Sequence, residues 1–370
     1  MEQIQQHKKN KKKDRKPIYL LLGFILFFSI FTYFITRPSL QSKAIEQIQV
    51  CTNVNDVKSL FDKYKFDLIE TDEVGNRIVS LEFQDAVRNR LNSFSLNQEE
   101  IRKCLEWLPP AKTSINVIVI PDLSRRIIDT LNNPNQIEND LFVLNTIWSS
   151  FVNYSKLKQD SKDMLMVDVT DKEQAKGQFD KVANQLLFDL SEHKGKSNRL
   201  YFTPDKDSQF KKSIITMYQF AKEKPLGADY VSYFRRYLVS NIKKTTLYDN
   251  YVNKVIIITD GYLEVNTDNN GVKNYTPRID QLYNSISIGN TKDVITMLGL
   301  NIPKVSIDLS NTDVLVCEIN ERKCCKNKDY EILKAYWEDW VTRMNGEITF
   351  VERKQANELT KKTIEDFLKN

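Results

Sequence analysis

Residues 115–126 have the sequence INVIVIPDLSRR, and this stretch decides the fold. Its first six residues are mostly β-branched and apolar, without the alternation of polar and apolar side chains that a half-exposed strand shows. We therefore expect a strand at 115–120 that is buried on both faces. Pro121 ends this strand, and the polar residues that follow occupy the loop at its carboxyl end.

Outward from this strand, short apolar runs alternate with amphipathic patterns of helical period. The apolar runs predict strands at 164–169, 255–258 and 314–319. The amphipathic patterns predict helices at 137–151, 210–217, 230–238 and 333–344, with Gly346 as the C-cap of the last helix. Strands that alternate with helices are typical of a parallel sheet covered on both faces. We therefore predict a doubly wound, mostly parallel α/β domain of Rossmann type over residues 111–350, and one further helix near 358–368 in the tail, 351–370.

The region before this domain, residues 37–110, has only short helical patterns. Apolar stripes predict three helices, at 57–64, 83–94 and 101–108. Asn97 and Glu100 have the spacing of a capping box, which marks the start of the third helix. We interpret the region as a small helical spacer or docking surface.

The N-terminus carries the whole net charge of the chain. The first seventeen residues contain seven Lys or Arg and two acidic residues, an excess equal to the formal net charge of +5. The remainder is electrically balanced, so a nucleic-acid-binding protein, which needs a cationic folded surface, is disfavoured. Residues 18–35 are uncharged and rich in Leu, Ile and Phe. As a helix they are about 27 Å long, close to the hydrocarbon thickness of a bilayer.

We predict a basic tail at 1–17 and a transmembrane signal-anchor helix at 18–36 in a single-pass membrane protein. Because the cations precede the span, we expect the N-terminus in the cytoplasm and the soluble domain on the extracytoplasmic side. A cleaved signal peptide is the nearest alternative, but residues 35–44 offer no small-residue cleavage pattern. A buried helix of a soluble protein is rarely apolar on every face.

The chain has five cysteines, Cys51, Cys104, Cys317, Cys324 and Cys325. No two of them are spaced as a C-x-x-C pair, so the spacing does not support a structural zinc site. Cys317 with Cys324 or Cys325 would suit a local disulfide in an oxidising compartment, and free thiols are the alternative. The odd number leaves at least one thiol unpaired within a monomer.

Two of the predicted strands end in an aspartate. Asp122 and Ser124 follow the first predicted strand, and Thr259 and Asp260 follow the third. Ligands of an open parallel sheet bind outside the carboxyl ends of the strands. Carboxylate and hydroxyl oxygens at that edge suit a hard cation such as Mg²⁺ or Mn²⁺. The alternative is that both aspartates only cap the turns that follow them.

With these motifs the chain resembles von Willebrand factor A (vWA) domains from residue 113 to about residue 350. That family holds a metal ion in an adhesion site built from D-x-S-x-S after the first strand, a threonine of a later loop often written G-T-D, and a T-D-G-like turn after the fourth strand. Asp122 and Ser124 match the first motif, and residues 259–261 match the last. The resemblance implies a bound Mg²⁺ or Mn²⁺ whose coordination is completed by a carboxylate of a partner protein.

Two residues depart from the family pattern. Arg126 stands where the family has the second serine of D-x-S-x-S, and Ala228 stands where it has the threonine. Either Asp229 replaces the missing ligand, or Arg126 pairs with Asp122 and Asp260 so that its charge replaces the metal. The sequence leaves both possibilities open, and metal binding is expected to be altered or lost.

The candidate site residues are of two kinds. The candidate metal ligands are Asp122, Ser124, Asp260 and Asp229. The candidate partner-binding residues are Thr259, Arg125 and Arg126, the arginines being suited to an acidic group of the partner.

The motifs of common enzyme classes are missing. The sequence has no P-loop and no G-x-G-x-x-G, and its two histidines, His7 and His193, lie in polar segments. A haloacid-dehalogenase-type phosphatase needs an acid where this chain has Ser124. We predict a non-enzymatic, membrane-anchored protein-binding module within a multi-protein membrane complex. The alternatives are a scaffold subunit that uses other surfaces and a metal-dependent hydrolase built on Asp122 and Asp260.

Overall fold

The structure, a computed structural model, describes ten stretches of the chain. These are residues 39–71, 77–105, 107–109, 113–157, 161–191, 201–244, 251–266, 272–322, 328–352 and 355–369. They belong to two compact units, Met1–Leu68 and Ile69–Asn370. The N-terminal tail and the predicted span at 18–36 lie outside the described residues. Within the stretches given above, no helix combines the length and the apolar character needed to cross a membrane.

In the first unit, helices α2 (Leu40–Gln49) and α3 (Val54–Leu68) pack against each other. The hydroxyl of Ser39 caps α2 by accepting a hydrogen bond from the backbone N of Ser42 at 3.0 Å. Ile48 of α2 and Phe61 of α3 are buried. The helix predicted at 57–64 is therefore confirmed as the central part of α3.

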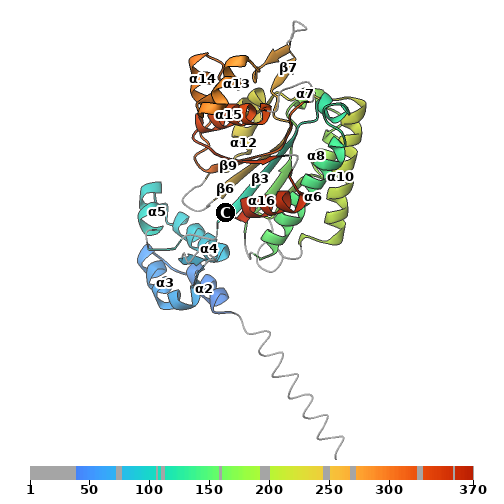
Figure 1. The fold of residues 1–370 in the computed structure, drawn as a ribbon. Helices are drawn as coiled ribbons and strands as arrows, with labels where there is room; N and C mark the ends of the chain where they lie inside the picture. Colours follow the sequence, from blue (N-terminus) through green and yellow to red (C-terminus); the bar gives the residue numbers. More distant parts are fainter. Residues whose placement is uncertain are drawn as a thin grey trace, which may run out of the picture. The chain divides into compact units, whose positions relative to one another are not determined.

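The second unit is built on one central sheet (Figure 1). In its described part six strands lie in the order β10-β9-β6-β3-β4-β5. They are β3 (Ser114–Pro121), β4 (Met164–Val167), β5 (Leu187–Asp189), β6 (Tyr251–Ile258), β9 (Thr312–Ile319) and β10 (Glu347–Glu352). Five are parallel, and β5 runs antiparallel to β4 at one edge. The prediction of an α/β fold with a mostly parallel sheet is confirmed.

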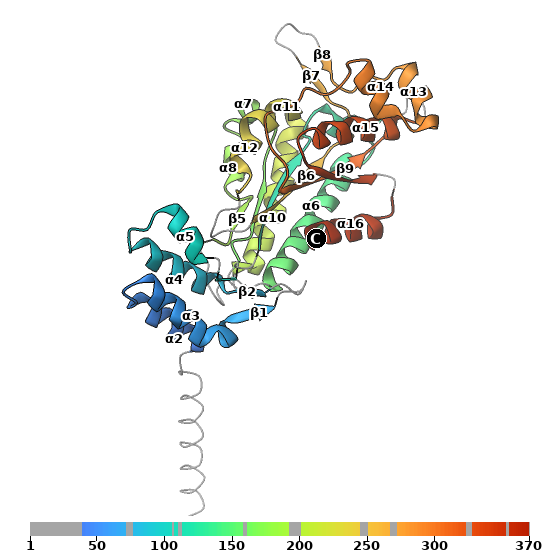
Figure 2. The ribbon, with the colours of Figure 1, turned by 90° about the vertical axis from the view of Figure 1, so that its left-hand side faces the viewer.

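Helices cover both faces of this sheet (Figure 2). One face carries α6 (Gln136–Leu157), α10 (Pro204–Glu223) and α16 (Asn357–Lys369). The other carries α11 (Tyr230–Tyr233), a π-helical turn at Phe234–Leu238, α12 (Val239–Asn241) and α15 (Asp329–Thr342). Val117 and Val119 of β3 enter the first core, and Ile118 and Ile120 enter the second. Two buried faces explain why the strand lacks polar alternation.

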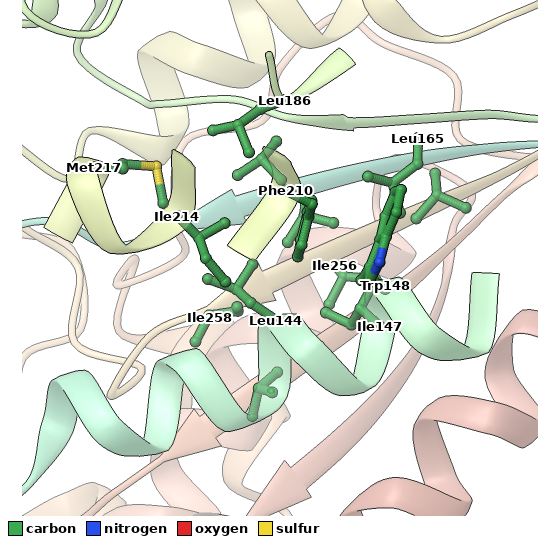
Figure 3. Packing of buried hydrophobic residues seen from close by; sticks show 14 of the residues in the cluster. Leu144, Ile147, Trp148, Leu165, Leu186, Phe210, Ile214, Met217, Ile256 and Ile258 are labelled. Carbon is green, nitrogen blue, oxygen red and sulfur yellow. The ribbon is translucent and has the colours of Figure 1, made fainter. Parts of the chain in front are cut away.

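The first core is centred on Trp148 (Figure 3). The ring of Trp148 stacks on that of Phe210, with 4.6 Å between the ring centroids. The ring centroid of Phe188 in β5 lies 4.4 Å from that of Trp148. The indole Nε1 of Trp148 donates a hydrogen bond to Asp207 at 2.8 Å, so the polar atom is satisfied. The predicted stripe at 137–151 thus packs α6 against the sheet and against α10.

Smaller elements complete the second unit. They are β1 (Ile69–Thr71), β2 (Arg77–Val79), α4 (Leu81–Asn92), α5 (Gln98–Leu105), η1 (Arg125–Ile127), α7 (Lys172–Ala175), α8 (Asp180–Ala183), β7 (Glu264–Asn266), β8 (Val272–Asn274), α13 (Asp280–Ser285), η3 (Ile286–Ile288) and α14 (Thr291–Met297). The predicted capping box at the start of α5 is confirmed. The backbone N of Asn97 donates a hydrogen bond to Glu100 at 2.8 Å, and the backbone N of Glu100 donates one to Asn97 at 2.9 Å.

The sequence patterns missed six strands in the described part of the second unit, and they misplaced one helix cap. The antiparallel pair β1–β2 lies inside the region predicted as helical, and β5 lies in what the sequence presents as a long insertion. β10 continues to residue 352, past the predicted domain limit of 350. The other two missed strands are β7 and β8, which form a short antiparallel pair. All of these strands are short or partly exposed, so they lack a continuous apolar run.

The residue that ends α15 in a left-handed conformation is Asn345, with φ 65°, and not Gly346 as predicted. Gly346 is required for a different reason. A Cβ at this position would lie 2.8 Å from Cγ1 of Val341 and 3.0 Å from Cβ of Leu309. The chain passes too close to its own core there for any side chain.

Cys317 is a free, buried thiol in β9, and Cys104 is also free. Cys324 and Cys325 lie outside the described residues. Burial, followed by the charge of Glu318, raises the pKa of the Cys317 thiol well above its ordinary value. This thiol is therefore a packed core group.

Gly346→Ala should lower the free energy of unfolding by about 1–3 kcal/mol, because the added methyl must displace Val341 and Leu309. Chemical denaturation of the full chain in detergent measures this change. The matched control is Asn345→Gly, which places a permissive residue at the left-handed position and should be tolerated. An equal loss in both variants would contradict the close-approach explanation.

Candidate functional site

The site lies where the strand order reverses. The chain leaves β3 toward β4 and leaves β6 toward β9, in opposite directions along the sheet. When the six strands of this sheet are renumbered 1 to 6 along the chain, their order in the sheet is 3-2-1-4-5-6, as in doubly wound sheets. Such sheets bind ligands in the crevice where the strand order reverses. The loops after β3 and β6 therefore meet there. The hydroxyl of Thr259 donates a hydrogen bond to Oδ2 of Asp122 at 2.9 Å, across 137 residues of sequence.

Asp122 forms hydrogen bonds through both carboxylate oxygens and through its backbone N. Its Oδ1 accepts a hydrogen bond from the backbone N of Ser124 at 2.9 Å, and its Oδ2 accepts the one from Thr259. Its backbone N donates to the carbonyl oxygen of Ile258 at 2.8 Å. Only 1% of Asp122 is exposed. Both carboxylate oxygens thus have partners within the protein.

Arg126 turns inward from the same loop and is 5% exposed. Its Nε lies 3.3 Å from Oδ2 of Asp122 and donates to the Asp122 carbonyl oxygen at 3.1 Å. Its Nη2 donates to Oδ2 of Asp140 at 2.8 Å and to the carbonyl oxygen of Ile258 at 2.9 Å. The guanidinium therefore connects the β3 loop, the end of β6 and helix α6.

Asp140 of α6 is the strongest partner of this arginine, and it is completely buried. Its Oδ1 accepts a hydrogen bond from Nε2 of Gln136 at 2.7 Å, and its Oδ2 accepts one from the hydroxyl of Tyr218 at 2.9 Å. Asp140 was not among the site residues predicted from the sequence. A signal was present, because Asp140 lies on the buried side of α6 next to the apolar stripe, and a carboxylate there needs a partner.

The electrostatic balance keeps Arg126 charged. Burial by itself would lower the pKa of Arg126, but the charges of Asp140 and Asp122 outweigh burial and raise that pKa above its ordinary value. Burial raises the pKa of the Asp140 carboxyl, and Arg126 opposes this change, followed by the hydrogen bonds from Gln136 and Tyr218. The three groups form a buried ionic network in which each charge depends on its partners.

Asp260 lies beside this network but is less well satisfied. It is 2% exposed, and its Oδ1 accepts a hydrogen bond from the backbone N of Tyr262 at 3.3 Å. Its Oδ2 lies 3.6 Å from Nη2 of Arg322 and has no hydrogen-bond partner among the described residues. Burial and the charge of Asp122 raise the pKa of Asp260 to about 6, although the charges of Arg322 and Arg126 act to lower it.

Arg322 covers Asp260 from the surface side. Its guanidinium lies 4.1 Å from the ring centroid of Tyr262, and its Nη1 contacts both carboxylate oxygens of Glu264 at 3.0 and 3.1 Å. Its side chain is 23% exposed. Arg322 was not predicted as a site residue, because it follows β9 in a segment that contains no recognisable motif.

The loop at 226–229 contributes differently from the prediction for it. Asp229 caps α11, because its Oδ1 accepts a hydrogen bond from the backbone N of Ser232 at 2.9 Å. Ala228 is buried in the second core. The residue of this segment that reaches the strand ends is Tyr230, whose hydroxyl donates to the carbonyl oxygen of Ile120 at 3.4 Å. Asp229 is thus engaged in helix capping.

Ser124 and Arg125 occupy the outer part of the β3 loop. The hydroxyl of Ser124 accepts a hydrogen bond from the backbone N of Arg126 at 3.4 Å and caps η1. Arg125 is exposed, whereas Arg126 and Thr259 are buried. Of the three residues predicted to contact a partner, Arg125 is the accessible one.

The residues present do not fit the divalent metal that the family resemblance implies. A guanidinium lies against Asp122 where a cation would bind, and both oxygens of that carboxylate are hydrogen-bonded. Within the described stretches, no three His, Cys, Asp or Glu side chains are grouped so as to hold a metal ion. The positive charge at this edge is supplied by arginine.

No protein-family model, no curated protein and no solved structure matches this chain. The assignment of a function therefore rests on the site itself.

Tyr218→Phe should lower the free energy of unfolding by about 1.5–3 kcal/mol, because Asp140 loses a hydrogen bond to a buried charge. Tyr230→Phe is the matched control: it removes an equally buried hydroxyl whose hydrogen bond is long and goes to a neutral carbonyl oxygen. Its effect should stay below about 1 kcal/mol. Both are measured by denaturant unfolding, and a larger loss for Tyr230→Phe would contradict the network described above.

Asp260→Asn should gain stability relative to wild type as the pH rises. The pKa of Asp260 in the fold, about 6, lies above its ordinary value of 3.8. The protonated carboxyl therefore stabilises the fold fully below about pH 4, and this contribution is lost as the pH rises through 6. The gain at neutral pH should reach at most about 3 kcal/mol.

Thermal unfolding at a series of pH values between 4 and 7.5 measures the effect. Asp308→Asn is a control of opposite sign, because hydrogen bonds from Asn345 and Ser310 lower the pKa of Asp308. That variant should lose stability relative to wild type toward neutral pH. A pH-independent difference for Asp260→Asn would show that the carboxyl is not perturbed in the fold.

Proposed function

We propose that the chain is a membrane-anchored, vWA-like protein-binding module that recognises its partner at the carboxyl ends of the sheet strands. The observation that carries this proposal is the hydrogen bond between Thr259 and Asp122, which joins the two strand-end motifs at the reversal of the strand order. Doubly wound sheets bind ligands at that place. The motifs and their location support the same site independently.

Binding, rather than catalysis, is supported by the state of the charged groups. Asp122 and Asp140 are paired with Arg126, and the hydroxyl of Thr259 is used as a donor to Asp122. A general base or nucleophile needs a free lone pair directed at a substrate. The two histidines lie outside the described residues. Carboxylates that are paired within the protein, as Asp122 and Asp140 are, suit a stable recognition surface.

The accessible part of this edge has mixed charge. Arg125 is exposed, and Arg322 and Glu264 are partly exposed. An acidic group of the partner would meet Arg125 first, as a charge-assisted hydrogen bond at the rim of the interface. The N-terminal sequence pattern supports the location: a basic tail at 1–17 and a span at 18–36 would hold the module on the extracytoplasmic side of a membrane, within a multi-protein complex.

A scaffold subunit is the second candidate, and one observation favours it. Ile288 of η3 is 73% exposed and Met297 of α14 is 76% exposed. Large apolar side chains with this exposure on neighbouring short helices suit a contact with another subunit. Both residues lie outside the loops that follow β3 and β6.

The two candidate functions predict that different variants lose the crosslinked partner. Arg125→Glu should reduce the amount of crosslinked partner at least about tenfold, because like charges across an interface cost several kcal/mol. The double variant Ile288→Ser, Met297→Ser should leave it unchanged. The measurement is chemical crosslinking of the full-length protein in its native membrane, with the partners of the wild type defined by mass spectrometry.

Lys362→Glu is the matched control, a charge reversal at an exposed position of α16. Loss of partners in the Ile288, Met297 variant alone would favour the scaffold candidate. Wild-type partner yields in both variants would overturn the proposal that either surface binds.

A further inference from the structure

We propose that Arg126 is a resident cation that permanently takes the place of a divalent metal at the carboxyl edge. This inference rests on the proposed function for its biological meaning, because it concerns the same site. The consequence is a recognition site that works in one fixed state and does not respond to divalent ions.

The position of the arginine supports this role. Arg126 stands at the third position of the motif Asp122-x-Ser124-x-Arg126, from which a side chain can turn back toward Asp122. It does so, and its Nε lies 3.3 Å from Oδ2 of Asp122. The exposed neighbour Arg125 belongs to the same loop but does not enter the interior. One arginine is therefore placed as a ligand partner and the other as a surface group.

The contacts of the guanidinium are those expected of a central cation. Nε and Nη2 reach the carbonyl oxygens of Asp122 and Ile258 and the carboxylate of Asp140. These oxygens come from the β3 loop, the last residue of β6 and helix α6. A metal ion gathers oxygen ligands in the same way, but it dissociates, whereas a side chain cannot.

Cationic side chains also stand beside both strand-end aspartates. Arg126 pairs with Asp122, and Arg322 lies 3.6 Å from Asp260, so two guanidinium groups supply the charge of one divalent ion to these two aspartates. Asp140 adds one carboxylate from α6, and hydrogen bonds from Gln136 and Tyr218 stabilise its charge. A divalent ion would have to displace an arginine that contacts two carboxylates and two carbonyl oxygens from a buried position, although its Nη1 has no hydrogen-bond partner among the described residues.

The proposal predicts that removing the arginine creates a metal site. Arg126→Ser restores the pattern D-x-S-x-S at residues 122–126 and releases Oδ2 of Asp122 from its ion pair. The variant should unfold at a lower temperature than the wild type in EDTA, because Asp122 and Asp140 lose their cation. Millimolar Mn²⁺ should bind once per chain with saturation and raise its unfolding temperature.

The test titrates the full-length protein in detergent with Mn²⁺ and with Mg²⁺ alone. Bound Mn²⁺ is counted by electron paramagnetic resonance, and the unfolding temperature is measured with each ion and with EDTA. The wild type should show no saturable binding and no shift. Arg125→Ser, which removes the same charge from the same loop, should behave like the wild type in both measurements.

A second variant covers the case in which Arg126→Ser does not fold. Arg126→Ser combined with Asp140→Asn removes the buried carboxylate that depends on the arginine, and it should fold and bind Mn²⁺. Saturable binding of Mg²⁺ or Mn²⁺ by the wild type overturns the proposal, as does a folded variant that binds no Mn²⁺. If neither variant folds, the wild-type titration decides alone.

The outcome is separable from that of the proposed function. The ion titration needs no partner, so it stands even if Arg125→Glu keeps its partners. Conversely, the crosslinking yield of the wild type should be the same in EDTA and in Mg²⁺. A partner that is lost in EDTA would overturn the resident-cation proposal while supporting the strand-end location.

Discussion

The ion pair between Arg126 and Asp140, extended to Asp122, is the interaction on which the second unit depends at its carboxyl edge. All three groups are buried, and losing one partner of such a pair costs about 3–5 kcal/mol because a charge is left without compensation. The pair fixes the position of α6 against the ends of β3 and β6. The hydrogen bonds of Thr259, Gln136 and Tyr218 are directed at this network.

The same network determines what remains for function. Its charged groups are paired internally, so the surface above it is formed by residues outside the network, such as Arg125 and Arg322 with its partner Glu264. The proposed recognition of a partner at this edge would then use direct contacts. Asp260 is the exception, because its Oδ2 has only the 3.6 Å ion contact with Arg322. Burial and the charge of Asp122 raise the pKa of this incompletely compensated carboxyl.

The fold was predictable where burial is two-sided. β3, β6 and β9 have continuous β-branched runs because both of their faces meet a core, and such runs cannot be mistaken for loops. β5 and β10 were not predicted, because each lies at a sheet edge with mixed polarity and takes its pairing from a neighbour distant in sequence. The meeting of Asp122 with Thr259 was predictable, since the ends of adjacent parallel strands share one edge.

The amino-acid sequence by itself determined the class of fold, the strand-end location of the site and the presence of an arginine in its motif. Only the tertiary structure decided which way that arginine turns and what it binds. Its main partner, Asp140, comes from a helix on one sheet face, and Tyr218 comes from the next helix along. Side-chain partners across elements follow from how helices pack on a sheet. Local patterns specify which residues are buried, but they do not specify which buried charges meet.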